Sequence, residues 1–381
     1  DSLVLYLDGE VAKAANVTRS PISSISGFHL YENRIIVRHE STDPLTIANM
    51  AVWDSSDDAD IPFTAVDAGT DTLSIPADHK LLIWTGKTFA PAGNVTLVGN
   101  GGGAAYDGTL EALANARFRA VSTESHSIGG SFIFGAGAVL ESNNATTTFT
   151  ANGSGRTIDV NEGSFGNLAF TGSGSYTFTD TNLTTTRSFT QSAGTVTFGT
   201  GTTTIGASFN ATGGTFTMSG TALVFTSVST GNTVRFDDST VPAMSFTGAG
   251  GSWTMADTNA TTTGSFLVSN TGTVTLPSGQ LGVGGSFTNA SGTVTHNTSD
   301  IILSATSSAT LTARTSDLFA VRKVGGGTVT ITDGSITLRD DLVIASGTLV
   351  AATNTLAIGG SFTVTGGSFN NASGTVLFNA T

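Results

Sequence analysis

Residues 188–218 read SFTQSAGTVTFGTGTTTIGASFNATGGTFTM and contain one pattern twice, with Phe189 and Phe209 twenty positions apart. In each copy, apolar residues alternate with threonine, as in Thr195-Val196-Thr197-Phe198 and Thr215-Phe216-Thr217-Met218. A period of two residues is typical of a strand with one buried face. Glycine recurs every few residues, and each one would cost a helix about 1 kcal/mol. The stretch therefore predicts short strands.

A longer repeat is superimposed on this pattern. The motif Ile128-Gly129-Gly130-Ser131-Phe132 returns with small changes at 205–209, 283–287 and 358–362, so that its copies begin at nearly even intervals. Within each long unit, aromatic or leucine positions recur about every 20 residues, as at Phe246, Phe266 and Phe287. Repetition at fixed steps is the sequence signature of stacked repeats.

Stacked coils explain both repeats better than other all-β folds do. A β-sandwich has no reason to repeat its sequence at a fixed step, and a propeller blade usually spans about 40–50 residues. We therefore predict an all-β protein, a β-solenoid with coils of about 19–20 residues and a long unit of about 77 residues. Inward-facing Phe, Val, Leu and Ile side chains would form its core.

The composition changes near residue 127, which predicts two regions. Residues 1–127 hold 16 of the 28 acidic residues, 8 of the 15 basic residues and five of the seven prolines. We expect an irregular β region over 1–127, acting as a contact or adaptor region, and solenoid repeats over 128–381. The first region would form a small sandwich or, as we favour, wider coils that begin the same solenoid. Its expected elements are a short helix at 111–119 and strands at 3–7, 33–39, 45–53, 72–75, 80–85 and 94–98.

Charge and composition exclude several functions. Only 11% of the residues are charged, against roughly 25% in an ordinary soluble domain, and the formal net charge is −13. This acidic balance argues against a nucleic-acid partner. The absence of cysteine excludes disulfides and thiol nucleophiles. We expect no membrane span, because no run of about 18 apolar residues is present. The opening at Asp1 lacks a methionine or signal sequence, as expected of a processed or partial chain.

The repeated Gly-Gly-Ser-Phe, Ala-Ser-Gly-Thr-Val and Asp-Thr-Asn units resemble those of large secreted bacterial surface proteins built from β-solenoid repeats. Segments 33–40 (NRIIVRHE) and 83–96 (IWTGKTFAPAGNVT) are similar to parts of very long repeat proteins of small-celled bacteria. The resemblance implies an extracellular, cell-surface fibre, stalk or adhesin, in the broad manner of filamentous-haemagglutinin-like proteins. It brings no catalytic residues.

Stacked β-helices also include enzymes that degrade polysaccharides, which need carboxylates that converge in one groove. Asp180 and Asp257 occupy equivalent places in successive long units, which is typical of a recurring turn residue. On a strand, the adjacent pairs Asp237-Asp238 and Asp340-Asp341 would point to opposite faces. We therefore expect no enzymatic activity, and we assign no catalytic residue and no cofactor.

Metal sites are not clearly indicated either. The run 54–60 (DSSDDAD) has enough carboxylates to hold calcium, but it lacks the glycine and distal glutamate of an EF-hand loop. An exposed acidic turn is the favoured interpretation. We expect the histidines on the solvated surface, because they show no metal-ligand spacing; they are His29, His39, His79, His126 and His296.

Threonine arrays suggest a minor alternative. The pairs 195/197 and 215/217 are twenty positions apart, as are 273/275 and 293/295, so they would align on one face. Flat threonine arrays resemble those of ice-binding solenoids. Threonine is also simply a good residue for an exposed strand face, and these arrays do not persist in every coil.

The last strand-like motif, Gly374-Thr375-Val376-Leu377-Phe378, is uncharged and has no polar cap. A terminal coil must be capped or paired, because its outer backbone groups otherwise lack partners. We therefore expect further repeats or identical subunits to continue the stack. The sequence predicts an extracellular structural protein that forms a filament, a homopolymer, by head-to-tail strand pairing. The alternative is an adhesin that binds a glycan, a host cell or a neighbouring cell, which an exposed aromatic row would favour.

Overall fold

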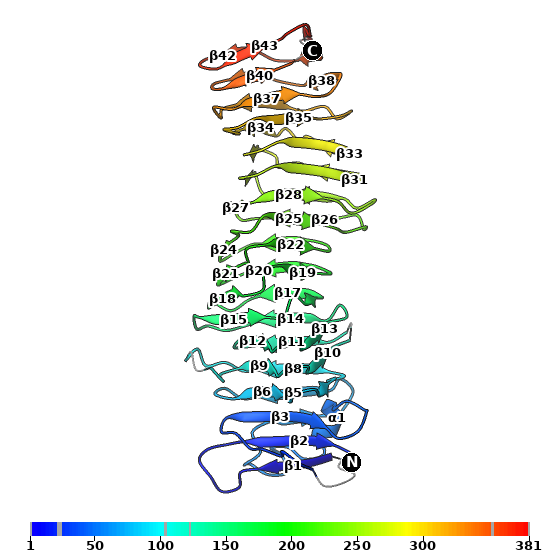
Figure 1. Cartoon of the computed structure of the whole chain (residues 1–381), viewed down its shortest axis with the longest axis vertical. Coiled ribbons are helices and arrows are strands. Elements are labelled where there is room, and N and C mark those ends of the chain that lie inside the picture. The colour runs from blue at the N-terminus through cyan, green and yellow to red at the C-terminus, as the bar shows by residue number, and fades with distance from the viewer. Residues whose placement is uncertain (1, 21–24, 103–104, 122, 352–353, 380–381) are drawn as a thin grey trace. The chain divides into compact units, whose positions relative to one another are not determined.

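The computed structural model describes residues 2–20, 25–102, 105–121, 123–351 and 354–379. The chain is 47% strand, and its stacked parallel coils form a β-solenoid with about 17 turns in total. They divide into two compact units. Unit 1 comprises Asp1–Gly199 and Gly213–Thr217, and unit 2 comprises Thr200–Thr212 and Met218–Thr381. Figure 1 shows the strands of the coils and labels many of them. The predicted fold class is confirmed.

The elements of unit 1 are mostly strands of two to six residues. They are β1 (Ser2–Tyr6), β2 (Ala15–Arg19), β3 (Arg34–His39), α1 (Ile47–Met50), β4 (Thr64–Val66), β5 (Thr72–Ile75), β6 (Lys80–Ile83), β7 (Thr88–Phe89), β8 (Asn94–Leu97), β9 (Thr109–Ala112), β10 (Arg117–Arg119), β11 (Ser125–Ile128), β12 (Phe132–Phe134), β13 (Val139–Glu141), β14 (Thr146–Phe149), β15 (Arg156–Asp159), β16 (Ser164–Phe165), β17 (Asn167–Phe170), β18 (Ser175–Phe178), β19 (Leu183–Thr185), β20 (Phe189–Gln191), β21 (Thr195–Thr197) and β24 (Thr215–Thr217).

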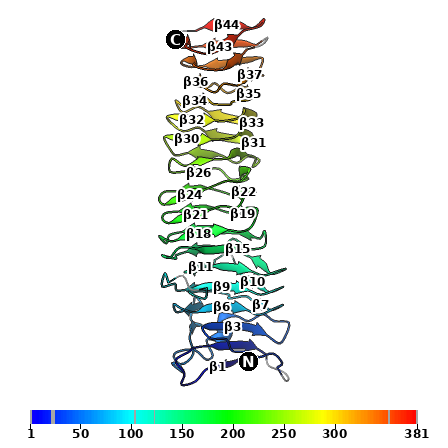
Figure 2. The ribbon, with the colours of Figure 1, turned by 60° about the vertical axis from the view of Figure 1, so that its left-hand side comes forward.

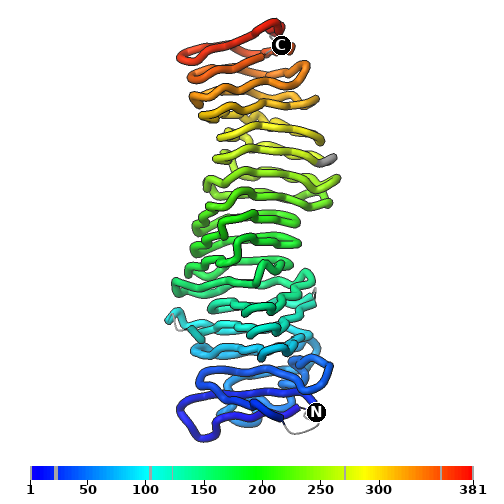
Figure 3. Tube along the Cα trace, viewed as in Figure 1, coloured from blue at the N-terminus to red at the C-terminus, as the bar shows by residue number. Residues whose placement is uncertain are grey.

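The first coils of unit 1 are wide, and later ones are regular (Figure 3). From β3 onward in the ten-stranded sheet, the number of residues per coil decreases. Position 34 pairs with 80, position 80 with 109 and position 110 with 132. Further along, Thr177 pairs with Thr197 and Thr197 with Thr217, which gives the predicted step of twenty positions (Figure 2).

The expectation that the irregular region begins the same solenoid is confirmed. β11 pairs in parallel with both β8 and β14, so the ladder runs through residue 127. A functional boundary there stays a prediction.

Most expected strands of the first region are present, but two assignments are wrong. Segment 45–53 contains α1 instead of a strand. Thr46 caps this helix, because its Oγ1 accepts from Asn49 N at 3.3 Å and Asn49 Oδ1 accepts from Thr46 N at 3.1 Å. Segment 111–119 is not helical: β9 ends, a turn with positive φ at Asn115 follows, and β10 begins.

The strands of unit 2 are likewise short, apart from β31 and β33. They are β22 (Thr202–Ile205), β23 (Phe209–Ala211), β25 (Ala222–Phe225), β26 (Asn232–Arg235), β27 (Thr240–Val241), β28 (Ala243–Phe246), β29 (Trp253–Met255), β30 (Asn259–Thr262), β31 (Phe266–Thr275), β32 (Gln280–Val283), β33 (Phe287–Thr295), β34 (Asp300–Leu303), β35 (Ala309–Thr312), β36 (Ala320–Lys323), β37 (Thr328–Ile331), β38 (Ser335–Leu338), β39 (Leu342–Ile344), β40 (Thr348–Val350), β41 (Thr355–Ile358), β42 (Phe362–Val364), β43 (Ser368–Asn370) and β44 (Thr375–Phe378).

Parallel pairing in unit 2 keeps the step of twenty positions. Leu281 pairs with Ile301 and Ile301 with Val321. At each copy of the long-repeat motif, a strand ends at the first residue of the motif and the next begins at its phenylalanine. Val283 thus ends β32 and Phe287 begins β33, and β41 and β42 meet in the same way. In unit 1, β11 likewise ends at Ile128 and β12 begins at Phe132.

Aromatic side chains stack through the core of each unit. In unit 1 the ring centroids of Phe149 and Phe170 are 5.1 Å apart. In unit 2 Phe225 and Phe246 are 4.8 Å apart, and Phe266 and Phe287 are 5.2 Å apart, with nearly parallel planes. All six rings are buried. The predicted inward apolar stack is therefore present, and each ring contributes packing beyond its buried area.

In the described part of the chain, no helix is long and apolar enough to cross a membrane. This agrees with the sequence, which lacks a long apolar run.

Corner glycines set how closely neighbouring coils approach. A Cβ at Gly284 would lie closer than 3.0 Å to the carbonyl oxygen of Thr263 in the preceding coil, a distance that real Cβ atoms essentially never show. The glycine is therefore needed for backbone contact at this corner, not for an unusual φ angle.

We predict that Gly284→Ala lowers the free energy of unfolding by about 1–3 kcal/mol, the usual cost of overpacking. The control is Gly334→Ala, since a Cβ at Gly334 would have nothing within 4 Å. Urea denaturation followed by circular dichroism would measure both. Equal midpoints for the two variants would contradict backbone contact at the corner.

Candidate functional site

Three open hollows lie on unit 1, and they are the first places to look for a ligand. The largest, of about 480 Å³, lies between the α1 segment and β4. Two others, of about 310 Å³ each, lie on the outer faces of β6 and β1. All their lining residues fall between Ser2 and Leu113.

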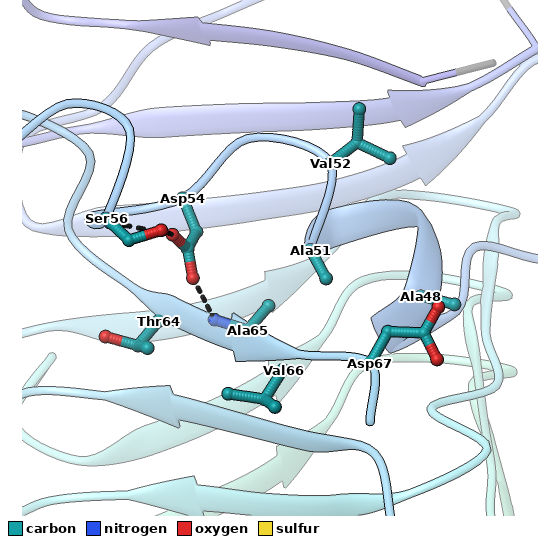
Figure 4. Close-up of a pocket in the computed structure, with 9 residues that line it drawn as sticks. All are labelled: Ala48, Ala51, Val52, Asp54, Ser56, Thr64, Ala65, Val66 and Asp67. Carbon is teal, nitrogen blue, oxygen red and sulfur yellow. Dashed lines mark hydrogen bonds between the residues drawn. The ribbon is translucent and has the colours of Figure 1, made fainter. Parts of the chain in front are cut away.

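The largest hollow contains one buried carboxylate, Asp54, which is 3% exposed (Figure 4). Asp54 accepts hydrogen bonds from Ser56 N (2.7 Å), Ser56 Oγ (2.6 Å) and Ala65 N (2.7 Å). Burial acts to raise the pKa of Asp54, but these hydrogen bonds outweigh it and hold the pKa below its usual value. The Asp54 carboxylate thus connects the loop around Ser56 to strand β4.

Two other aspartates of the run 54–60 form contacts with the first coil. Asp58 accepts from the Tyr6 hydroxyl at 2.8 Å, and Asp60 accepts from Gly9 N at 2.7 Å and pairs with the ammonium of Lys13. Asp8, Asp58 and Asp60 are close enough together to hold a metal ion. The Lys13 ammonium already supplies positive charge at Asp60. The run thus makes structural contacts, and Asp54 is buried, so the expectation of a wholly exposed acidic turn is wrong.

The recurring aspartates cap turns of the preceding coil. Asp180 accepts from Val160 N and Glu162 N, both at 2.7 Å. Asp257 accepts from the backbone of Phe236 (2.5 Å) and of Asp237. Burial raises the pKa of both carboxyls, against the opposing effect of these hydrogen bonds. The turn-residue interpretation is confirmed.

A third aspartate, which the sequence analysis missed, acts in the same way. Asp333 accepts from Ala313 N and Arg314 N of the preceding coil. It does not lie in the Asp-Thr-Asn motif that marks the other two, but it follows Asp257 by 76 positions, as Asp257 follows Asp180 by 77, so the long repeat could have revealed it.

The two adjacent aspartate pairs do not lie on strands, so the argument that they would point to opposite faces of a strand does not apply to them. Asp237 and Asp238 both have positive φ in a turn. Asp340 and Asp341 lie at the corner between β38 and β39, and a Cβ at Gly360 would come closer than 3.0 Å to a carboxylate oxygen of each. Burial and the charges of this pair raise the pKa of nearby Asp300.

Several ionisable side chains of unit 1 are buried, among them one of the histidines that the sequence analysis placed on the surface. His126 is 1% exposed, and its Nε2 lies 3.3 Å from Glu124 Oε2, so its expected solvated position is wrong. Arg156 and Asp107 form a buried pair at 3.0 Å. Asp107 also accepts from Asp78 N and Asn100 N. The Arg156–Asp107 pair joins coils of unit 1, and none of these side chains lines the three hollows.

The threonine arrays align as expected. In unit 1, Thr195 and Thr197 pair with Thr215 and Thr217, and the hydroxyl oxygens of Thr195 and Thr215 are 3.2 Å apart. In unit 2, positions 273 and 275 pair with 293 and 295. Ice binding itself stays a prediction.

An exposed aromatic cluster surrounds the hollow on β6. The ring centroids of Tyr31 and Trp84 are 6.4 Å apart, and His29 lies 5.9 Å from Tyr31 and 5.7 Å from Trp84. Arg34 lies over the Tyr31 ring at 5.5 Å, and Glu111 pairs with Lys80 at 2.6 Å. Sequence reasoning missed this site, because its residues come from coils of unequal length and follow no repeat.

The last strands of unit 2 present a second exposed surface. β42 and β44 lie at the ends of their sheets, paired with β39 and β41. Val364, Leu377 and Phe378 are exposed there.

Unit 2 also holds a lysine inside its core. Lys323 is 0% exposed and lies in a ladder between the buried side chains of Leu303 and Ile344. Its Nζ donates to Gly325 O. Burial lowers the pKa of Lys323 below its ordinary value of 10.5. The unfolded chain therefore binds this proton more tightly, and stability increases with pH between the lowered pKa and 10.5.

We predict that Lys323→Met raises the free energy of unfolding at neutral pH by about 1–3 kcal/mol, because it removes a poorly solvated charge. The advantage over the wild type should shrink as pH approaches 10.5, where the unfolded state also loses its proton. Urea midpoints at neutral and alkaline pH would measure this, with the half-buried Lys87→Met as control. A destabilised variant, or an advantage independent of pH, would contradict the account.

Comparison with known proteins gives no match. No family model matches the chain, and neither a curated protein nor a solved structure is similar enough to count as a match. The resemblance to filamentous-haemagglutinin-like surface proteins therefore stays a prediction, whereas the β-solenoid fold that it implied is the one observed.

Proposed function

We propose that this protein is a non-enzymatic, extracellular structural protein whose β-solenoid extends into a cell-surface filament by strand pairing between identical subunits. One observation carries the proposal. In the ladder from β41 to β44, Ile358 pairs with Phe378, yet Ile358 is 0% exposed and Phe378 is 63% exposed. The same position of the coil is thus buried in one turn and open in the next.

Both the backbone polar groups and the apolar side chains of this exposed coil favour binding of another strand. The outer edges of β42 and β44 offer backbone donors and acceptors that a parallel strand would satisfy. Fully burying a side chain such as Phe378 is worth about 1.5–3 kcal/mol. A further coil of the same form would gain both contributions.

The first strand supplies a complementary edge. β1 lies at the end of its ten-stranded sheet and is paired on one side with β2. Leu3 and Leu5 are exposed on β1, and Trp53 lines the apolar hollow beside it. A subunit that presented β1 to the β42–β44 edges of another copy would cover apolar surface on both.

The chain also lacks the usual protection against such pairing. Natural edge strands often carry lysine or proline. Here residues 342–381 contain no charged residue, and the whole sequence has four lysines. The extracellular location rests on this composition and on the resemblance to secreted surface proteins.

An adhesin is the second candidate. The exposed aromatic cluster at Tyr31 and Trp84 favours this function, because aromatic faces are common in binding sites and structural coils do not need them on the surface.

We predict that the protein forms linear oligomers whose length grows with concentration and that Phe378→Lys suppresses them at least tenfold. The lysine would place an uncompensated charge between coils, which costs more than the ~1.4 kcal/mol that corresponds to a tenfold effect. Sedimentation velocity and negative-stain electron microscopy would measure the oligomers.

The matched control is Val228→Lys, which changes a valine that is 71% exposed and lies outside the strands. This variant should assemble like the wild type. A wild type that stays monomeric, or that stops at a dimer, would contradict filament formation. So would equal assembly of both variants.

A further inference from the structure

We propose that the hollow formed by Tyr31, Arg34, Leu82, Trp84, Glu111 and Leu113 is a binding site for a neutral saccharide, with one hexopyranose ring against the aromatic side chains. The inference goes beyond filament assembly and does not depend on it. The hollow lies wholly within unit 1.

The aromatic rings provide the apolar surface that a sugar ring needs. Tyr31 is 40% exposed, and its ring plane is inclined by 24° to that of Trp84. His29 extends the same cluster, at 25° to Tyr31. The C–H faces of a pyranose are apolar and flat, so they pack against such rings and exclude water there.

Polar groups at the rim suit hydroxyl groups. Arg34 makes one side-chain hydrogen bond, at 3.3 Å to Glu32 O, and a guanidinium has five N–H donors. One oxygen of Glu111 accepts from Lys80, and a carboxylate offers further lone pairs. Within the described residues, neither the Tyr31 hydroxyl nor the Trp84 indole N–H has a hydrogen-bond partner. Donors and acceptors therefore surround an apolar centre, as in small-molecule sites.

The site is held in place before any ligand arrives. Leu82 and Glu111 are directly paired between β6 and β9, and Ile36 pairs with Leu82 on the other side. The segment that carries His29 and Tyr31 is anchored by Asn16 Nδ2 to His29 O at 2.9 Å and by Arg38 to Gly27 O at 2.8 Å. A preorganised site loses little entropy on binding.

Charge and size favour a neutral saccharide over other ligands. The lining holds one cation, Arg34, and one anion, Glu111, which pairs with Lys80, so the hollow lacks the cluster of positive charges that a phosphate or a nucleic acid needs. Its volume of about 310 Å³ lies at the lower end for small-molecule sites, roughly 300–1,000 Å³. One or two sugar rings fit this space, and a folded partner does not.

The test is titration of the full chain with hexasaccharides of glucose, mannose and galactose, followed by tryptophan fluorescence and calorimetry. We expect at least one of these hexasaccharides to bind with a dissociation constant of about 1 mM, as for other small polar ligands on open sites. Trp84→Ala and Tyr31→Ala should each weaken binding at least tenfold, and Trp84→Phe should weaken it less, because a ring remains. Circular dichroism would show that the variants are folded.

Trp53→Ala is the matched control, because Trp53 is 53% exposed and lies outside this hollow. It should bind like the wild type. The proposal is overturned if none of the three sugars binds at about 10 mM, or if the Trp84 and Tyr31 variants bind as tightly as the Trp53 variant. Phe378→Lys should still bind sugar, which separates this site from assembly.

Discussion

Backbone hydrogen bonding between successive coils is the constraint on which the rest of the structure depends. A strand of three or four residues cannot satisfy its own donors and acceptors, so each coil needs a neighbour on both sides. That requirement explains the step of twenty positions between paired threonines, and it explains the glycines at corners where backbones meet. It also explains why polar side chains such as Asp180 cap turns of the preceding coil.

The regular features were predictable from sequence because they repeat. Alternation around Val196 indicated the strands, and the spacing of Phe189 and Phe209 indicated the coil length. The exceptions are local or depend on distant partners. The capping box of Thr46 and Asn49 overrides a strand-like pattern over α1. His126 is buried where its Nδ1 accepts from Val95 N of the preceding coil, a contact that no spacing rule reveals.

The two candidate sites, the exposed surface at Phe378 and the hollow at Trp84, also differ in how far the sequence repeat reveals them. The repeat identifies Ile358 as the counterpart of Phe378, because the two pair in adjacent coils, yet only Ile358 is buried. The hollow at Trp84 does not follow from any repeat, because the long and unequal coils that link β3, β6 and β9 bring Tyr31, Trp84 and Glu111 together. We place assembly at the regular coils and ligand binding at the irregular ones, so that each proposed function uses a different part of the fold.

The central claim, that residues twenty positions apart lie directly on top of one another, is open to a direct measurement because the chain has no cysteine. Thr348 and Ser368 are paired in adjacent strands, with their hydroxyl oxygens 2.9 Å apart. Parallel neighbours lie about 4.8 Å apart, within the range that a disulfide bridges. The double variant Thr348→Cys, Ser368→Cys should therefore form an intramolecular disulfide on mild oxidation, detectable by mass spectrometry of the folded monomer. Two thiols that stay free under those conditions would contradict the stacking of coils.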